Sequence, residues 1–167
     1  VLFVWKGDHA LVDFRVFYTA GERFIAGEPL CQAADGHYQF KYLPVSAAFF
    51  VPLAILPLAA AKFIWMIVVV AALAGLVYGS WRMLGQSKER WTVIVLPTVL
   101  IMVKFYVHEL QLGQANAVFG AILIVAFLAL AARQEITAGI LIGAAVLFKP
   151  YAVIFIPYLV LRRAGRT

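Results

Sequence analysis

The sequence predicts an all-α polytopic membrane protein. Of its 167 residues, 65% are hydrophobic and 13% are charged, and the mean hydropathy is +0.94. Soluble domains have about 45–50% apolar and about 25% charged residues. Several uncharged stretches, residues 63–81 being the clearest, are long enough to cross a bilayer as a helix. Helices are expected because each backbone polar group inside a bilayer must be satisfied within its own segment.

The distribution of charge supports a membrane protein and argues against a nucleic-acid-binding protein. The formal net charge is +6, but the basic residues are scattered singly and many flank apolar stretches, which is the positive-inside pattern of membrane proteins. We therefore exclude nucleic acid as a partner. The chain has one cysteine and no Cys/His or Asp-x-Asp spacing typical of a metal site, so the sequence predicts metal-independent chemistry without a cofactor.

The first loop, residues 1–44, carries five of the eight acidic residues. From Asp13 onward, apolar residues recur at helical spacing, and Gly27 with Pro29 is a typical stop signal. This pattern predicts an amphipathic helix in the plane of the membrane interface, with Asp13 as its N-cap. Residues 1–5 resemble the tail of a preceding apolar segment. We therefore interpret the chain as a single incomplete membrane domain, residues 1–167.

Residues 45–167 are predicted to hold the transmembrane helices. The uncharged stretch 42–61 contains Pro44, Pro52 and Pro57, each of which removes a backbone donor and kinks a helix. Two interpretations stay open for this stretch: a re-entrant or short piece near residues 45–58, or a full crossing. Residues 63–81 then cross the membrane.

Charged loops predict the topology of these helices. Arg82, Lys88 and Arg90 frame a short loop that belongs in the cytoplasm, so the first loop lies outside if residues 42–61 do not cross fully. Residues 91–107 return, with Lys104 near the outer end, where it can snorkel. A polar turn at residues 108–116 follows on the outer side, and residues 110–132 can cross back.

Residues 136–161 carry a single charge, Lys149, followed by Pro150. A straight crossing would place Lys149 at mid-membrane and the following arginines outside, against the positive-inside rule. We therefore predict two short or re-entrant half-spans that meet at Lys149 and Pro150. Gly139 and Gly143 predict a face suited to close helix packing.

Three separated sequence blocks carry a family resemblance. They are DFRVFYTAG (13–21) with AGEPL (26–30), KYLP (41–44) with PLA (52–54) and Trp65, and LGQAN (112–116) with AG (138–139), Gly143 and FKPY (148–151). Together they resemble glycosyltransferase family 87, the polytopic mannosyltransferases of the GT-C structural class that use polyprenyl-phosphate-sugar donors. Leu43 and Cys31 depart from the family pattern, which often has Pro and Tyr there.

The resemblance implies a GT-C-like helical bundle in the plasma (inner) membrane, multi-pass, with an extracytoplasmic active site and the first loop carrying the interfacial helix. It also implies that Asp13 is the catalytic base, which takes the proton of the acceptor hydroxyl. The alternative from the residues themselves is that Asp13 only caps its helix. Asp8 is the reserve candidate.

Other polar residues are candidates for binding the two substrates. Lys149 is predicted to bind the donor phosphate, with His108 and Lys104 as helpers, although Lys149 can also snorkel and His108 can be structural. Arg15 and Lys41 are weaker candidates and suit solvated charges. The predicted sugar- or acceptor-binding residues are Gln114, Asn116, Tyr42 and Glu109. Asn116 can instead cap a helix, and Tyr42 can be an interface anchor.

These observations predict a membrane hexosyltransferase that moves a sugar, expected to be mannose, from a polyprenyl-phosphate donor to an extracytoplasmic lipid or glycan acceptor. A single displacement would invert the anomeric configuration. The alternative is a transporter or flippase for lipid-linked sugars, because broken helices and an intramembrane lysine also occur in transport pathways. The acidic residues gathered in the outer loop favour the enzyme.

Overall fold

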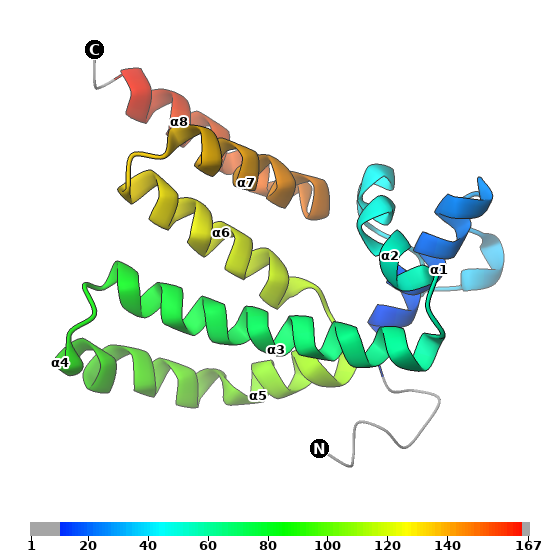
Figure 1. The fold of residues 1–167 in the computed structure, drawn as a ribbon, viewed down its shortest axis with the longest axis horizontal. Coiled ribbons are helices and arrows are strands. Elements are labelled where there is room, and N and C mark those ends of the chain that lie inside the picture. The colour runs from blue at the N-terminus through cyan, green and yellow to red at the C-terminus, as the bar shows by residue number, and fades with distance from the viewer. Residues whose placement is uncertain (1–10, 165–167) are drawn as a thin grey trace.

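The computed structural model describes residues 11–164, and within this range all regular elements are helical. The elements are α1 (Val12–Ala26), η2 (Ala33–Asp35), η3 (Pro44–Phe50), α2 (Val51–Ala54), α3 (Leu58–Met83), α4 (Lys88–Arg90), η4 (Trp91–Val95), α5 (Leu96–Leu112), α6 (Asn116–Ala131), α7 (Glu135–Phe148), η5 (Pro150–Ile154) and α8 (Phe155–Ala164). The long helices lie along the longest dimension of the molecule, and a smaller group that includes α1 and α2 covers one of their ends (Figure 1). Asp8 and residues 1–5, for which the sequence made predictions, lie outside the described residues.

Helix α1 is the predicted amphipathic helix, and it ends at Gly27, whose φ of 68° is the left-handed conformation typical of a helix C-terminus. The predicted N-cap was wrong. Leu11 holds the N-cap position, and Asp13 lies in the first helical turn without a capping hydrogen bond. A carboxylate there still faces the positive end of the helix dipole. The side chain of Asp13 is thereby left available for another role.

An aromatic core holds α1 on the long helices. Phe14 and Phe17 of α1 pack with Phe50 of η3 and Trp65 of α3, all at most 5% exposed. The rings of Phe17 and Phe50 stack with centroids 4.8 Å apart, and the Trp65 indole N–H donates to the Gly113 carbonyl at 2.8 Å. Truncating a buried aromatic side chain of this kind costs about 3–5 kcal/mol. The position of α1 is therefore firmly fixed.

The proline-rich stretch does not form one long helix. A 3₁₀ helix, η3, and a single turn, α2, together cover residues 44–54, and the chain breaks before α3 begins at Leu58. This short piece packs across α1, where Gly21 allows the approach: a Cβ there would lie 2.8 Å from the Ala54 Cβ. The Tyr18 hydroxyl also donates to the Leu56 carbonyl at 2.8 Å. The piece therefore stays at the end of the molecule where α1 lies.

Within residues 11–164, two helical segments are long and apolar enough to cross a membrane, Leu58–Met83 and Lys88–Leu112. The first is 26 residues, about 39 Å at 1.5 Å per residue. The second is continuous through α4, the π-helical η4 and α5. The wider π turn lies directly before Pro97, whose ring would clash with the carbonyl four residues earlier in a regular α-helix.

The last helices form a hairpin. Helix α7 ends at Phe148, Lys149 is extended with φ −139° and ψ 105°, and η5 then leads into α8. Helix α8 then runs back towards the end where α7 begins (Figure 1). Its Phe155 packs edge-on against Phe127 of α6 at 5.2 Å, and Leu159 packs against the cluster of Ala129, Leu130 and Ala138. The chain therefore turns at the predicted lysine and proline.

Two details of this region differ from the sequence predictions. Helix α6 begins at Asn116, because the turn at Gly113 places residues 110–112 in α5. Within residues 11–164, nothing packs against the predicted glycine face: no atom lies within 4 Å of a Cβ built on Gly139 or Gly143. Helix α7 instead buries its alanine-rich face.

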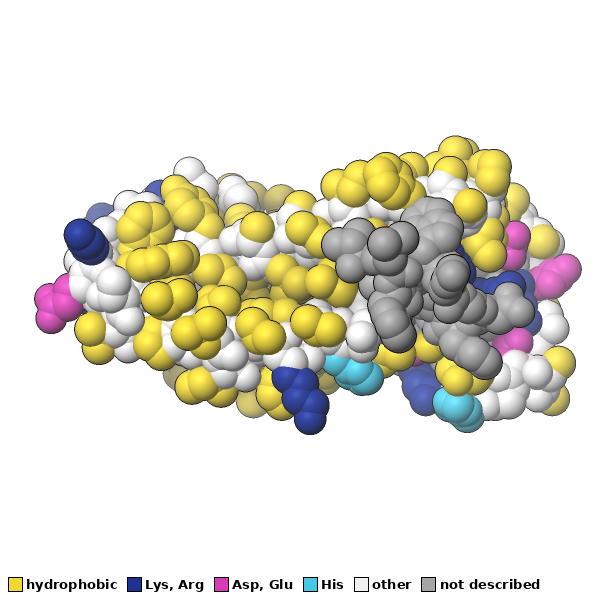
Figure 2. Space-filling model, turned by 90° about the horizontal axis from the view of Figure 1, so that it is seen from below, with side chains coloured by type: hydrophobic (Ala, Val, Ile, Leu, Met, Phe, Trp, Pro, Cys, Tyr) yellow, Lys and Arg dark blue, Asp and Glu magenta, His cyan; other side chains and the backbone are white. Residues whose placement is uncertain are grey.

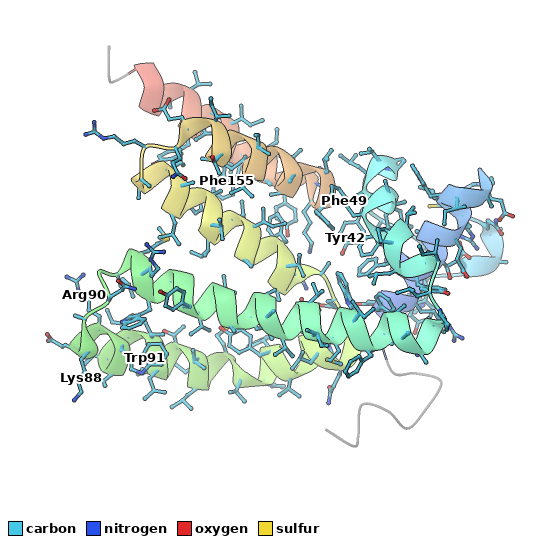
Figure 3. All side chains as sticks on the ribbon, in the orientation of Figure 1. Tyr42, Phe49, Lys88, Arg90, Trp91 and Phe155 are labelled. Atoms are coloured by element: carbon cyan, nitrogen blue, oxygen red, sulfur yellow. The ribbon has the colours of Figure 1, made fainter. Side chains whose placement is uncertain are left out.

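Charged side chains gather towards the two ends of the molecule. Tyr42 and Phe49 lie at the opposite end from Lys88, Arg90 and Trp91 (Figure 3). A broad hydrophobic surface covers the long helices between them, and most charged side chains in this view lie towards the two ends (Figure 2). This is the arrangement expected of helices that span a bilayer, with their polar ends in water.

Candidate active site

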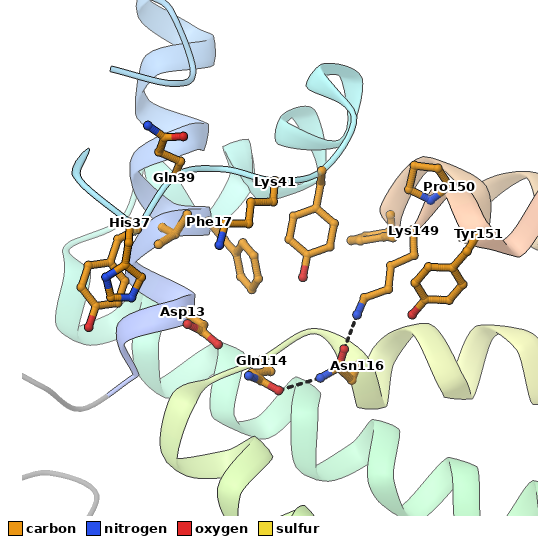
Figure 4. Close-up of a pocket in the computed structure, with 14 residues that line it drawn as sticks. Asp13, Phe17, His37, Gln39, Lys41, Gln114, Asn116, Lys149, Pro150 and Tyr151 are labelled. Atoms are coloured by element: carbon orange, nitrogen blue, oxygen red, sulfur yellow. Dashed lines mark hydrogen bonds between the residues drawn. The ribbon is translucent and has the colours of Figure 1, made fainter. Parts of the chain in front are cut away.

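Five of the predicted site residues line one cavity of about 540 Å³ at the end where α1 lies (Figure 4). They are Asp13, Tyr42, Gln114, Asn116 and Lys149. Asp13 enters from α1 on one side and Lys149 from the junction of α7 and η5 on the other, with the two amide side chains between them (Figure 4). The volume is within the 300–1,000 Å³ typical of small-molecule sites.

Asn116 is the centre of a hydrogen-bond network in this cavity. Its amide nitrogen donates to the Glu109 carboxylate at 3.0 Å and to the Gln114 side-chain oxygen at 2.6 Å. Its amide oxygen accepts a hydrogen bond from the Lys149 ammonium group. Asn116 thus links α5, the turn after it and the α7–η5 junction. The alternative interpretation of Asn116 as a helix cap is wrong, since Ala115 holds that position.

Glu109 lies behind this network rather than in the cavity lining. It is 8% exposed, and its second carboxylate oxygen accepts the Ala117 backbone N–H at 2.8 Å. The negative charge therefore stabilises the first turn of α6 and orients Asn116. The predicted sugar-binding role for Glu109 is not supported by this geometry, because the side chain is buried and does not line the cavity.

Aromatic side chains hold the Lys149 side chain in position. The Lys149 ammonium nitrogen lies 5.7 Å from the centre of the Tyr151 ring and 6.0 Å from that of Phe119, distances typical of cation–π contacts. The preceding residue, Phe148, stacks on Phe49 at 4.9 Å. Phe49 belongs to η3, so the broken piece between residues 44 and 54 helps to place the cation.

Asp13 and Tyr42 share one wall of the cavity. Asp13 is half-buried, and no hydrogen bond of its carboxylate to another described residue is present. The Tyr42 ring packs edge-on against Phe17 at 5.3 Å. Burial, together with the negative charges of Asp13 and Glu109, raises the pKa of Tyr42 to about 12. Tyr42 is therefore a neutral hydroxyl, and Asp13 is the carboxylate that faces the cavity.

Two predicted phosphate-binding residues do not reach the cavity. Lys104 and His108 are four residues apart on α5 and lie on its exposed face, whereas Glu109 is buried on another face. Proximity along the sequence suggested a shared site, but the 3.6-residue period of the helix separates these side chains from the cavity. Their predicted role is not supported by the structure.

The structure also adds residues that were not predicted. They are His37, Tyr38, Gln39 and Tyr151, which line the cavity. Lys41, a weaker candidate from the sequence, lines it as well. The sequence of residues 31–41 is polar and irregular, which is typical of a loop that can line a site. No pattern in it indicates which side chains point into the cavity. In residues 11–164, no three His, Cys, Asp or Glu side chains lie close enough together to bind a metal ion.

An ion pair holds the loop that supplies these residues. The Arg23 guanidinium donates two hydrogen bonds of 2.7 Å to Asp35 and a third, of 3.0 Å, to the Leu30 carbonyl. Asp35 also accepts the Gln32 backbone N–H at 2.9 Å. The hydrogen bonds from Arg23 and Gln32 lower the pKa of Asp35 to about 2. The loop is thereby closed against α1 at neutral pH.

We expect Asp35→Asn to loosen residues 28–43. A carboxylate whose folded pKa is lowered stabilises the fold above its ordinary pKa of 3.8, and this contribution is lost as the pH falls from there towards about 2. Amide hydrogen exchange of these residues should therefore increase in the variant at pH 7, and in the wild type, after correction for intrinsic rates, near pH 2. Glu28→Gln, an exposed carboxylate in the same loop, is the control; equal exchange in both variants would contradict the role of the pair.

Comparisons with known proteins agree with the sequence resemblance. The model of glycosyltransferase family 87 matches residues 40–167, a range that contains Tyr42, Gln114, Asn116 and Lys149 but begins after Asp13. The chain is 30% identical over 114 residues, 68% of its length, to a polyprenol-phosphate-mannose-dependent alpha-(1-2)-phosphatidylinositol pentamannoside mannosyltransferase of Mycolicibacterium smegmatis. The match spans 27% of the length of that relative. No solved structure matches. The chain belongs to glycosyltransferase family 87.

Proposed function

We propose that the protein is a GT-C-type membrane mannosyltransferase that transfers mannose from a polyprenyl-phosphate donor to a lipid-linked or glycan acceptor. The observation that carries this proposal is the shared cavity, with the Asp13 carboxylate on one side and the Lys149 ammonium on the other. Family membership supports glycosyl transfer. The name of the mycobacterial relative supports the donor, a polyprenol-phosphate mannose, and an acceptor that carries a mannoside on a lipid.

The two charged groups match the two needs of the reaction, which are a base for the attacking hydroxyl and a positive charge beside the departing phosphate. Asp13 takes the proton from the acceptor hydroxyl as the hydroxyl oxygen attacks the anomeric carbon. The bond from that carbon to the phosphate oxygen breaks with inversion, and Lys149 stabilises the negative charge that develops on the departing polyprenyl phosphate. Gln114 offers its amide group to sugar hydroxyls. Asn116, whose amide is engaged by Glu109, Gln114 and Lys149, positions the last two side chains.

The charge distribution supports an extracytoplasmic site. The helix ends and turns away from the cavity carry Arg82, Lys88, Arg90 and Arg133, which the positive-inside rule assigns to the cytoplasm. The stretch that left the topology open is residues 42–61. Its proline-rich part, residues 44–54, packs on α1 at the cavity end, which supports the re-entrant interpretation. A multi-pass arrangement in the plasma membrane follows, with the cavity outside and close to the bilayer surface, where a lipid-linked donor can present its phosphate.

Transfer can be distinguished from transport directly. A transporter holds its substrate near the middle of the membrane, whereas this cavity lies at the ends of α5, α6 and α7. We expect the purified full-length protein in detergent to form a mannosylated product from polyprenyl-phosphate mannose and a soluble mannoside acceptor. Movement of the lipid donor across proteoliposomes without product would overturn the proposal in favour of a flippase.

A further inference from the structure

A second cavity of about 560 Å³ adjoins the proposed active site. Val12, Arg15, Thr19 and Arg23 of α1 line it, together with Leu30, Asp35, Tyr38 and Phe40 of the loop after α1. Val16 and Tyr38 line both cavities. The second cavity is therefore a neighbouring compartment that adjoins the active site at these two side chains.

Helix α1 presents a different face to each compartment. Asp13 and Phe17 face the active site, whereas Arg15, Thr19 and Arg23 recur every four residues and face the second cavity. A ligand that crosses the edge at Val16 and Tyr38 can therefore touch the proposed base with one end and a row of hydrogen-bond donors with the other.

The chemistry of the second cavity suits a neutral glycan. Tyr38, which is 50% exposed, and Phe40 offer aromatic surface to the apolar C–H face of a sugar ring. Arg15 offers donors, and the Thr19 hydroxyl can both donate and accept, as sugar hydroxyls do. Among the described residues that line this cavity, Asp35 neutralises Arg23. The cavity therefore lacks the clustered positive charge expected of a phosphate site.

We propose that this second cavity is an acceptor subsite, which binds the sugar units next to the one that is glycosylated. The inference rests on the proposed function and extends it, because it makes the acceptor an oligosaccharide or glycolipid of more than one sugar. Tyr38 lies at the edge between the two compartments and contacts the linkage between the sugar in the active site and its neighbour.

The test compares a short and a long acceptor. Purified full-length protein is assayed with polyprenyl-phosphate mannose and either methyl mannoside or a mannotetraose methyl glycoside. The wild type should have the larger kcat/KM with the tetrasaccharide. Arg15→Gln and Thr19→Val each remove hydrogen bonds that only the long acceptor makes, so each should reduce the ratio of kcat/KM, long over short, by about tenfold.

The matched control is Glu22→Gln, which removes an exposed charge from the same helix outside both cavities and should leave the ratio unchanged. An equal loss with both acceptors in Arg15→Gln and Thr19→Val would overturn the subsite. The subsite would also be overturned if the two variants lost activity with a short acceptor that carries a phosphate, and not with the longer acceptor. That result would indicate a site for an anionic headgroup. Thermal unfolding of each variant distinguishes misfolding from lost binding.

A binding measurement separates this inference from the proposed function. If the wild type transfers mannose to neither acceptor, the proposed function fails, but the two glycosides can still be titrated into the protein by calorimetry. Tighter binding of the tetrasaccharide than of the monosaccharide, with the difference lost in Arg15→Gln and Thr19→Val, supports the subsite. Equal affinity for the two glycosides overturns it.

Discussion

Asp13→Asn should reduce mannosyl transfer by about 10²- to 10⁴-fold, the usual contribution of a positioned general base. Asparagine keeps the shape of the side chain but cannot accept the proton of the acceptor hydroxyl. The residue caps no helix, and its carboxylate faces the cavity opposite Lys149, so we expect the variant to insert and fold normally. Initial rates with purified lipid donor measure the loss, and the thermal unfolding midpoint measures the fold.

The matched control is Glu22→Gln, on the same helix but outside the cavity, which should retain wild-type turnover. The expected loss is in kcat rather than in the KM for donor, because the base acts in the transition state. Turnover of Asp13→Asn at the wild-type rate would remove Asp13 from the mechanism. The family match begins at residue 40, so this experiment is the direct test of the base.

Lys149→Gln should reduce kcat by about 10²- to 10³-fold, the loss typical when one group that stabilises developing negative charge is removed. Glutamine can still hydrogen-bond to the Asn116 amide, so the network around that residue is largely kept while the positive charge is lost. Lys149→Arg, which restores the charge, should recover part of the rate. The measurements are kcat and the donor KM with polyprenyl-phosphate mannose.

Lys104→Gln is the control for this prediction. It removes the same charge from an exposed position on α5 that does not line the cavity, and we expect transfer to be unchanged. Equal impairment of the two variants would indicate a general effect of membrane charge rather than a contact with the phosphate. Wild-type kcat in Lys149→Gln would exclude the lysine as the stabilising group.

The sequence alone predicted the helices whose signals are local. The charge-free stretch at residues 63–81 lies within α3, the amphipathic pattern from Asp13 gave α1, and Lys149 with Pro150 marked a turn between two helices. These predictions succeed because hydrophobic length, helical periodicity and the missing N–H of proline act within one segment. The family resemblance, confirmed by the family model, also depends on short local motifs.

The composition of the site depended on packing that no local pattern describes. Glu109 was expected in the cavity and instead accepts a hydrogen bond from Asn116 outside the lining. Lys104 and His108 were also expected there, but they lie on the exposed face of α5. The rotation of α5 about its axis decides these positions. That rotation is set by contacts with α3 and α1, which come from distant parts of the sequence.

The sequence by itself determined that the protein is a helical membrane protein, which segments form its helices and which family it resembles, because hydrophobicity and motif are properties of the chain. Only the tertiary structure decided that Asp13 faces a cavity instead of capping α1, and that Lys149 reaches the same cavity. The reason is the aromatic core of Phe14, Phe17, Phe50 and Trp65, which joins three separate segments and fixes how α1 is turned. The second cavity on the other face of α1 is a consequence of the same packing.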